Sequence, residues 1–397
     1  MCYSLATDRV SKEENILERI DTLLQTDIDQ GLLPGASVLV ARRSKILYFK
    51  TFGMQDKQAG IPMATDTIFR LYSMTKPIIG VAVMILHEEG RLSLGQPVAK
   101  LLPEFAETRV GVVGKDAATG EATLSLEPVS RRMTVHHLLT HTAGLSYRFN
   151  APKPFKEPMK QAKIADRDRT LADMTLKLSK LPLVHQPGTA WHDGWSYDVL
   201  GRVIEVVADA PPDQFLAERI FRPLGMVDTG FYVPQDKLER LAKQDPEAEK
   251  KRPLLDVATR PNLLLGGGGL VSTITDYARF AQMLLNGGSL DRVRILSSKT
   301  VAYMTADHLG PLANRGDWQY FPGPGYGYGL GVGVRLTAGM SREIGTLGDY
   351  YWGGSAGTYF WVDPKEELVA VIMYQSRTQR ARYRPLIRSL VYRAMVD

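Results

Sequence analysis

The residues best suited to chemistry in this chain are Ser73 and Lys76, in the tetrapeptide Ser-Met-Thr-Lys. They stand where an extended stretch, 67–72, gives way to an apolar run, 78–86, that predicts a helix. Positions three apart are neighbours on one helix face, so Lys76 can reach Ser73 Oγ. A serine hydroxyl needs a base to become a good nucleophile, and the positive end of a helix favours anionic oxygen. The pair therefore predicts a nucleophile that carries its own base.

Alone, this spacing is weak support for an active site. Ser73 could equally be an ordinary helix N-cap, with Lys76 extended into solvent. The elements and motifs around the pair must decide between the two interpretations.

The composition is that of a globular protein and excludes several other classes. The chain has 397 residues, 44% hydrophobic and 23% charged, which is enough to bury a large core. Net charge is +6, and the basic clusters 250–252 and 377–384 are interpreted as solvated faces, so no nucleic-acid partner is expected. The single cysteine, Cys2, excludes an internal disulfide and thiolate metal clusters.

The N-terminal segment lacks the apolar core of a signal peptide, and no apolar run reaches membrane-spanning length. We therefore expect a cytoplasmic protein with no membrane partner.

The elements that must position the pair form an α/β (α+β) pattern. Short strands near both termini, separated by tight turns, predict an antiparallel sheet built from both ends of the chain and flanked by helices. A mainly helical subdomain is inserted between them. The predicted division is 1–70 with 270–397 for the sheet domain, and 71–269 for the helical domain that carries Ser73 and Lys76.

Individual elements follow from hydrophobic periodicity and turn residues. The predicted strands are 36–41, 46–50 (ending by Gly53), 327–334, 358–362 and 368–373. The predicted helices are 11–31, the run after Ser73 that closes near Gly90, 135–139, 171–181, 197–208, 212–222, 275–285 and 379–395.

Several further segments carry a resemblance over nearly the whole chain. They are Thr134 to Leu145 (TVHHLLTHTAGL), Pro187 to Trp191 (PGTAW), Asp198 to Gly201 (DVLG) and Gly266 to Thr273 (GGGGLVST). With Ser-x-x-Lys opening the central helix, they make the chain resemble the serine β-lactamase/penicillin-binding-protein superfamily. Among its branches, the chain is most similar to family VIII carboxylesterases and fungal acyltransferases with the class C β-lactamase fold.

The segment Trp352-Gly353-Gly354-Ser355 distinguishes between those branches. The resemblance implies that it replaces the Lys-Thr-Gly of β-lactamases, whose lysine helps hold a substrate carboxylate. Trp352 has no charge, and its apolar face suits an uncharged ester. We therefore expect Trp352, Gly353 and Gly354 to contact substrate, and the N–H groups of Ser73 and Ser355 to form an oxyanion hole.

Two other motifs are weighed and set aside. Residues 353–357 fit the G-x-S-x-G nucleophile elbow, but an elbow needs a following helix and a strand is expected there. His136, His137 and His141 are clustered, yet no glutamate lies between His137 and His141 as in a zinc helix. We interpret them as structural and expect no metal and no cofactor.

One position departs from the family pattern. The family has a tyrosine two residues after the tryptophan of the PGTAW segment, and that tyrosine shuttles protons near the nucleophile. Counting forward from Trp191 and backward from Asp198 both reach Asp193. Tyr197 repeats the Trp-x-Tyr spacing and is an alternative supplier of the hydroxyl, as is Tyr147. A carboxylate near Lys76 would keep the lysine protonated and weaken it as a base.

The sequence thus predicts a serine carboxylesterase that hydrolyses short-chain esters through an acyl-enzyme on Ser73, with Lys76 as base and activity impaired by Asp193. The small-molecule ester is its only expected partner. Alternatives are an acyltransferase, a β-lactamase or D-alanyl-peptidase, and an inactive binding protein on the same fold. The sequence leaves the acyl chain length and the oligomeric state open.

Overall fold

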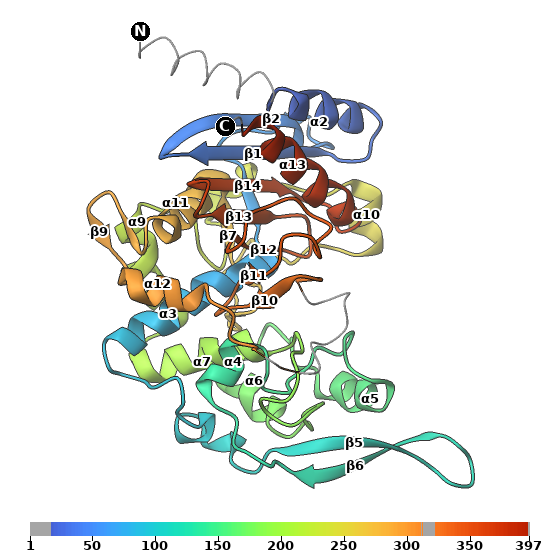
Figure 1. The fold of residues 1–397 in the computed structure, drawn as a ribbon. Helices are drawn as coiled ribbons and strands as arrows, with labels where there is room; N and C mark the ends of the chain where they lie inside the picture. The colour runs from blue at the N-terminus through green and yellow to red at the C-terminus, as the bar shows by residue number, and fades with distance from the viewer. Residues whose placement is uncertain (1–16, 311, 313–321, 396–397) are drawn as a thin grey trace.

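An eight-stranded antiparallel sheet forms the centre of the molecule (Figure 1). The computed structural model describes residues 17–310, 312 and 322–395. In spatial order the strands are β10 (Tyr326–Tyr328), β11 (Gly333–Arg335), β12 (Tyr350–Gly353), β13 (Tyr359–Asp363), β14 (Leu368–Tyr374), β1 (Gly35–Arg42), β2 (Lys45–Asp56) and β3 (Ile61–Pro62).

The sheet is joined from the two ends of the chain, as predicted. β1 pairs with β14 along its length, from Ala36 opposite Tyr374 to Arg42 opposite Leu368. β1 and β2 form a hairpin whose turn residues, Arg43 and Ser44, have φ values of 52° and 61°. Two such left-handed residues give the turn a twist that matches the paired strands.

Two predicted strand boundaries were wrong. β2 continues to Asp56 rather than ending by Gly53, because Gly53 takes a φ of 66° and bends the strand without ending its pairing. The predicted strand 327–334 is two strands, β10 and β11, with a turn between them that includes Gly331 at φ 110°. The alternating glycines in 327–334 favoured the prediction of one extended strand, but glycine also allows the backbone to turn.

Helices are present at the predicted positions, most with shifted ends. Those of eight residues or more are α2 (Arg19–Asp29), α3 (Thr75–Glu88), α5 (Lys153–Ala162), α6 (Leu171–Leu178), α7 (Ser196–Ala208), α11 (Ile274–Leu285) and α13 (Arg380–Ala394). Shorter ones are α4 (Val135–Leu139), α8 (Pro212–Leu216), α9 (Arg222–Leu224), α10 (Pro246–Lys251) and α12 (Ser298–Met304). Helices α5, α10 and α12 occur in addition to the predicted ones. Positions 11–16 of the first predicted helix lie outside the described residues.

Several features were not predicted, including the short helices α10 and α12. Helix α5 was missed, and so was the hairpin of β5 (Arg109–Lys115) and β6 (Ala122–Pro128), whose side chains are mostly exposed and carry no apolar alternation. The predicted helix 212–222 is split by a π-helical turn, 217–221, between α8 and α9.

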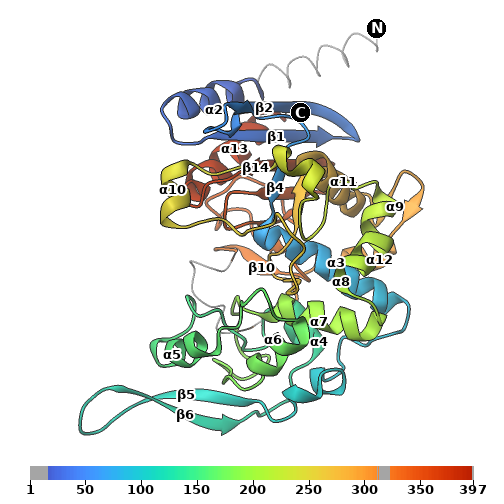
Figure 2. The same ribbon diagram turned by 180° about the vertical axis from the view of Figure 1, so that it is seen from behind.

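Helices cover both faces of the sheet. Along β14, Leu368, Ala370 and Ile372 pack with α2 and α13, whereas Val369 and Val371 face the core shared with α3 and α11. This period of two is what a strand buried on both faces requires. In Figures 1 and 2, α3 runs between the sheet and the helices α4, α6 and α7.

A two-stranded pairing holds the segment that leads into α3. β4 (Ile68–Arg70) pairs antiparallel with β7 (Val271–Thr273), outside the main sheet and close to both ends of the predicted helical domain. The division of the chain into these two domains stays a prediction. No helix in the described part of the chain has both the length and the apolar character to cross a membrane.

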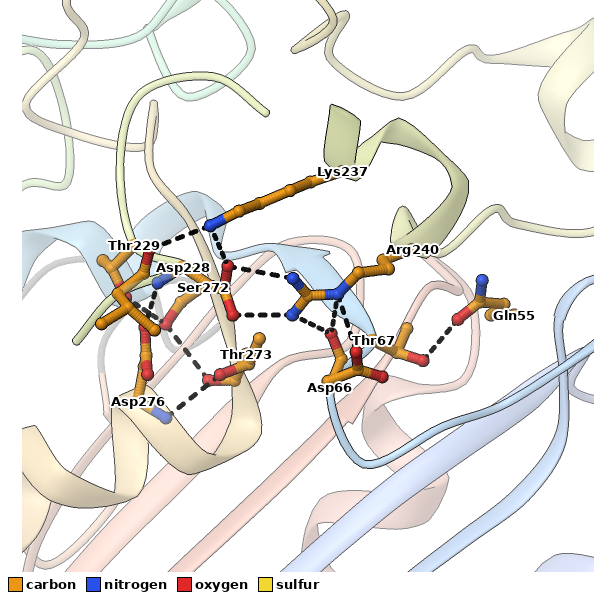
Figure 3. Close-up of polar contacts among 11 residues, drawn as sticks. Gln55, Asp66, Thr67, Asp228, Thr229, Lys237, Arg240, Ser272, Thr273 and Asp276 are labelled. Carbon is orange, nitrogen blue, oxygen red and sulfur yellow. Dashed lines mark hydrogen bonds and ion pairs between the residues drawn. The ribbon is translucent and has the colours of Figure 1, made fainter. Parts of the chain in front are cut away.

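A polar network reinforces this pairing from one side (Figure 3). Asp228 accepts hydrogen bonds from Lys237 Nζ at 2.7 Å and Arg240 Nη2 at 2.6 Å. Arg240 also donates to the carbonyl of Asp66, just before β4, and Asp276 accepts the Asp228 N–H at 2.8 Å. The network thus ties the residues before β4 to the segment 228–240 after α9 and to the first turn of α11.

Candidate active site

Ser73 lies in a cleft of about 720 Å³ between the sheet and the helical part of the chain. The cleft walls come from the turn before α3, the loop after α4, the loop before α7, the glycine-rich segment before β7, the end of β12 and the start of α13. Segments from almost the whole chain therefore meet around one serine.

A strained backbone residue presents Ser73 to the cleft. Ser73 is in a 3₁₀ turn, 72–74, directly before α3, and Tyr72 has a φ of 49°. This conformation is unfavourable for a bulky residue and persists only where surrounding contacts hold it. The Tyr72 hydroxyl supplies them: it accepts from the Leu255 N–H at 2.8 Å and from Arg377 Nη2 at 2.9 Å.

Lys76 is fully buried with its amine on Ser73. Nζ lies 2.9 Å from Ser73 Oγ and 2.9 Å from the carbonyl oxygen of Gly267. The first distance is what a helical i, i+3 pair allows. The second partner fixes the amine, because a carbonyl accepts one of its protons in either charge state.

Asp193 is in the cleft beside this pair. Its Oδ1 lies 3.8 Å from Lys76 Nζ and 3.4 Å from His141 Nε2, and has no hydrogen-bond partner among the described residues. Burial raises the pKa of Asp193, while Lys76 and the Gly194 N–H oppose that shift. The position that the family pattern reserves for tyrosine is thus spatially next to the base.

His141 is a neighbour that the sequence interpretation treated only as structural. Its side chain is fully buried, its φ is 55°, and neither ring nitrogen has a hydrogen-bond partner in the described part of the chain. Burial, with the charges of Lys76 and His192, lowers its pKa well below the ordinary value, so the ring is neutral at pH 7. The resembling segment contained His141, but nothing in it signalled contact with Asp193.

Asp198 and Tyr147 hold the carbonyl that contacts Lys76. Asp198 accepts from the Gly267 N–H at 2.9 Å and from the Tyr147 hydroxyl at 3.2 Å. Burial raises the pKa of Asp198 to about 6. A Cβ at Gly267 would lie 2.5 Å from Asp198 Oδ2 and 2.7 Å from the Tyr147 oxygen, so any larger residue must displace one of these side chains.

Tyr197, the predicted alternative hydroxyl, lies elsewhere. It is fully buried, its hydroxyl donates to the carbonyl of Leu139 at 2.7 Å, and it does not line the cleft. The side chain of Trp195 lines the cleft instead. Helix α7 begins at Ser196, and this turns Tyr197 inward toward α4. Tyr197 is therefore corrected from a candidate site residue to a core residue.

The segment 352–355 faces Ser73 only in part. Trp352, Gly353 and Ser355 line the cleft, although Trp352 is 8% exposed and packs edge-on against Tyr328 at a centroid distance of 5.2 Å. Gly354 does not line it, which corrects that prediction. A Cβ at Gly354 would lie 2.2 Å from the Leu71 carbonyl, so this glycine serves close packing under the Ser73 turn.

Two backbone N–H groups at the cleft have no acceptor. Neither the Ser73 N–H nor the Ser355 N–H donates to any group in the described ranges. Strand β13 follows Ser355, as expected when the nucleophile-elbow interpretation was set aside.

Residues from both basic clusters also line the cleft, in addition to forming exposed surface at 250–252 and 380–382. They are Arg252, Arg377, Arg380 and Arg384. The exposed Arg148 lines it as well.

The three clustered histidines separate in space. His137 closes a capping box with Thr134 at the start of α4, as its structural interpretation expected, and His136 Nε2 lies 3.1 Å from His308 Nδ1. Within the described residues, no three His, Cys, Asp or Glu side chains are grouped so that they could hold a metal ion.

Comparison with known proteins places this geometry in context. A family model described as Beta-lactamase matches residues 20–392. An uncharacterized protein of Mycobacterium tuberculosis (strain CDC 1551 / Oshkosh) is 38% identical over 360 residues, 87% of each chain. Lovastatin esterase of Penicillium rubens is 32% identical over 306 residues, 74% of each chain. The solved structure titled "EstCE1, a hydrolase with promiscuous acyltransferase activity" superposes with a TM-score of 0.79 at 28% identity, covering 98% of this chain and 100% of that one.

Proposed function

The chain belongs to the beta-lactamase family, and from this premise we propose that it is a serine carboxylesterase acting on short-chain esters. The esterase and hydrolase relatives support a serine hydrolase of the β-lactamase fold. The observation that carries the finer proposal is the 2.9 Å distance between Lys76 Nζ and Ser73 Oγ in the cleft.

In the proposed acylation step, neutral Lys76 removes the Ser73 hydroxyl proton as Oγ attacks the ester carbonyl carbon. The carbonyl π electrons move to oxygen, and the free N–H groups of Ser73 and Ser355 donate to that oxyanion. Collapse of the intermediate re-forms the carbonyl and breaks the bond to the alcohol oxygen. That oxygen takes the proton from the Lys76 ammonium, directly or by way of the Asp193 carboxyl group.

Deacylation repeats these transfers with water. The water oxygen attacks the acyl carbon while Lys76 accepts its proton, and the new intermediate expels Ser73 Oγ. Lys76 then returns the proton to Oγ, so the carboxylic acid leaves and the enzyme is regenerated. Lys76 must therefore be neutral twice in each cycle.

Asp193 works against that requirement. Its Oδ1 lies 3.8 Å from Lys76 Nζ. When ionised, a carboxyl group at this distance attracts positive charge, whereas proton transfer from Ser73 needs an uncharged amine. A tyrosine hydroxyl at this position would instead exchange a proton with an amine of similar basicity. We therefore propose that the chain is slower than a counterpart with tyrosine at 193.

The test is p-nitrophenyl acetate hydrolysis by the chain, Ser73→Ala and Asp193→Tyr. Turnover that Ser73→Ala abolishes supports the esterase, and turnover that persists in Ser73→Ala overturns it. Asp193→Tyr should raise kcat at least tenfold, since positioned proton transfer contributes about 10²–10⁴ in rate. If kcat does not rise, the impairment proposal is wrong; loss of activity in Asp193→Ala would then identify Asp193 as a productive proton carrier.

Acyl transfer is the second candidate, because the EstCE1 structure is titled a hydrolase with promiscuous acyltransferase activity. Adding an alcohol to the same assay separates the two reactions: an acyltransferase gives new ester faster than free acid. A β-lactamase is disfavoured by the uncharged Trp352, and nitrocefin turnover equal to ester turnover would reverse that ranking.

A further inference from the structure

We propose that the substrate of this cleft carries an anionic group, a carboxylate or a phosphate, that binds four arginines of the cleft wall. These are Arg252, Arg377, Arg380 and Arg384, here called the arginine cluster. The inference rests on the proposed esterase function, because it names the class of ester that the same cleft takes.

The arginine cluster is assembled from two parts of the chain. Arg252 directly follows α10, and the other three belong to the segment that begins α13. Both views of the ribbon place α10 beside the start of α13 (Figures 1 and 2). All four side chains line the cleft that contains Ser73, so the fold concentrates positive charge on one wall.

No carboxylate of the described residues neutralises the arginine cluster. Among the residues that the structure describes, none of the four forms an ion pair with Asp or Glu. Their neighbours on α13 differ: Arg382 Nε pairs with Asp27 at 2.9 Å, and Arg388 pairs with Asp349. The guanidinium groups of Arg377 and Arg384 donate instead to neutral oxygens, the Tyr72 hydroxyl and the Gly354 carbonyl.

Two donors of the arginine cluster are buried without an acceptor. The Nε atoms of Arg377 and Arg384 have no hydrogen-bond partner among the described residues. A buried unsatisfied donor on a charged group is costly, and a bound anion would remove that cost. Arginine is well suited to the task, since its planar fork matches the oxygens of carboxylate and phosphate.

Helix electrostatics add to the positive potential of this wall. Arg380 and Arg384 stand in the first turns of α13, and no side chain caps the helix at Gln379. Cations at a helix N-terminus oppose the helix dipole, so their placement there disfavours folding slightly. Partial burial and the charges of Arg384, Arg377 and Arg252 lower the pKa of Arg380. An anion at this wall would relieve each of these repulsions.

The arginine cluster is close enough to Ser73 for one substrate to reach both. Arg377 Nη1 lies 3.4 Å from Ser355 Oγ, and its Nη2 lies 2.9 Å from the hydroxyl of Tyr72, the residue before Ser73. The uncharged Trp352 lines the same cleft. The expected substrate thus has a neutral ester at Ser73 and a separate anionic substituent directed to α13.

Binding measurements test the arginine cluster without requiring catalysis. Titration calorimetry would compare benzoate, phenyl phosphate and the neutral benzamide on the full chain. The test variant is the double substitution Arg252→Gln with Arg380→Gln, neither of which bonds to the backbone around Ser355. The matched control is Arg393→Gln, which removes one charge from the far, exposed end of the same helix. Thermal unfolding confirms that each variant is folded.

We expect at least one of the two anions to bind tenfold or more tighter than benzamide. The affinity of the double variant for that anion, relative to benzamide, should be at least tenfold lower than in the wild type. Arg393→Gln should keep the wild-type preference. Tighter binding of phenyl phosphate would assign a phosphate group to the substrate, and tighter binding of benzoate would assign a carboxylate group. Equal binding of anions and benzamide, or undiminished anion binding by the folded double variant, overturns the inference. Anion binding with no Ser73-dependent ester turnover would instead refute only the esterase function.

Discussion

At the scale of single residues, the site depends on how the Lys76 amine is held. Two acceptors fix it, Ser73 Oγ and the Gly267 carbonyl, and a carboxylate stands nearby at Asp193. Gly267 in turn is held by Asp198 through its N–H. The position of the Lys76 amine is therefore set in part by a glycine and a buried aspartate.

Gly267→Ala should impair catalysis more than stability. The added methyl group would displace Asp198 or Tyr147, which lie within 2.7 Å of it, and would shift the carbonyl that holds Lys76. We expect kcat to fall about 10–100-fold, since small misplacements of catalytic groups cost that much. Gly201→Ala on α7, whose Cβ would meet nothing closer than 3.7 Å, is the control. Similar kcat values for Gly267→Ala and Gly201→Ala would refute the role of Gly267 in positioning Lys76.

Asp198 should leave a pH signature in stability. Its folded-state pKa of about 6 lies above the ordinary value of 3.8, so the folded protein holds this proton more tightly. The resulting stabilisation is present below pH 4 and is lost as pH rises through 6. Relative to Asp198→Asn, the wild type should lose on the order of 1–3 kcal/mol between pH 4 and 7, measured by urea unfolding. A difference that stays constant or grows with pH would contradict the assignment.

Residue-level prediction from the sequence succeeded where spacing decides contact. The i, i+3 rule placed Lys76 on Ser73, and counting from two anchors identified Asp193 as the departure now found beside Lys76. It failed for Tyr197 and Gly354, and it missed the contact of His141 with Asp193. Those outcomes depend on how α4, α7 and β12 pack together, and local spacing carries no information about that packing.

At the scale of elements, the β4–β7 pairing supports the turn that carries Ser73. Its polar network has Asp228 at the centre, 11% exposed and bonded to both Lys237 and Arg240 (Figure 3). Burial works to raise the pKa of Asp228, but these two cations outweigh it and the net shift is downward.

Asp228→Asn should therefore destabilise the chain by about 1–3 kcal/mol at pH 7, as expected for a hydrogen-bonded group that loses charged partners. A lowered folded-state pKa means that this stabilisation is present above pH 4 and disappears as pH falls below it. Asp213→Asn, which removes the more exposed ion pair between Asp213 and Arg260, should cost less than about 1 kcal/mol. Urea unfolding of both variants at pH 7 and pH 3 is the measurement, and equal losses at pH 7 would contradict the central role of Asp228.

Elements with a strong hydrophobic pattern were predictable, and those without it were not. The short continuous apolar runs of β13 and β14, bounded by a turn, and the longer apolar run of α3 identified them correctly. The β5–β6 hairpin has mostly exposed side chains, so no hydrophobic pattern marked it. The alternating glycines between β10 and β11 are compatible with either a continuous strand or a turn. Packing of Gly331 against the start of α3 selects the turn.

At the scale of the whole molecule, one face of the sheet shares a core with the helices of the inserted part, and the other face packs against α2 and α13. A single apolar cluster contains residues from the N-terminal strands, from α3 and α7, and from β13 and β14, such as Leu39, Leu200 and Val371. The same long-range assembly brings Arg252 to the start of α13, which no local reading of two basic clusters could reveal.

One shared core predicts one cooperative unfolding transition. Tryptophan fluorescence, which reports on Trp191 in the helical part and Trp361 in the sheet, should coincide with far-ultraviolet circular dichroism during urea unfolding. Two separated transitions would instead indicate that 71–269 unfolds apart from the sheet, as an independent domain would.

The central claim is that Ser73, activated by Lys76, becomes acylated. The most direct measurement is the intact mass of the chain after brief exposure to p-nitrophenyl acetate and acid quench, followed by peptide mapping. The proposed mechanism predicts a gain of one acetyl group on Ser73, absent in Ser73→Ala and retained in Ser355→Ala, which keeps its backbone N–H. An adduct that persists in Ser73→Ala, or ester turnover with no adduct on Ser73 under any quench, would contradict it.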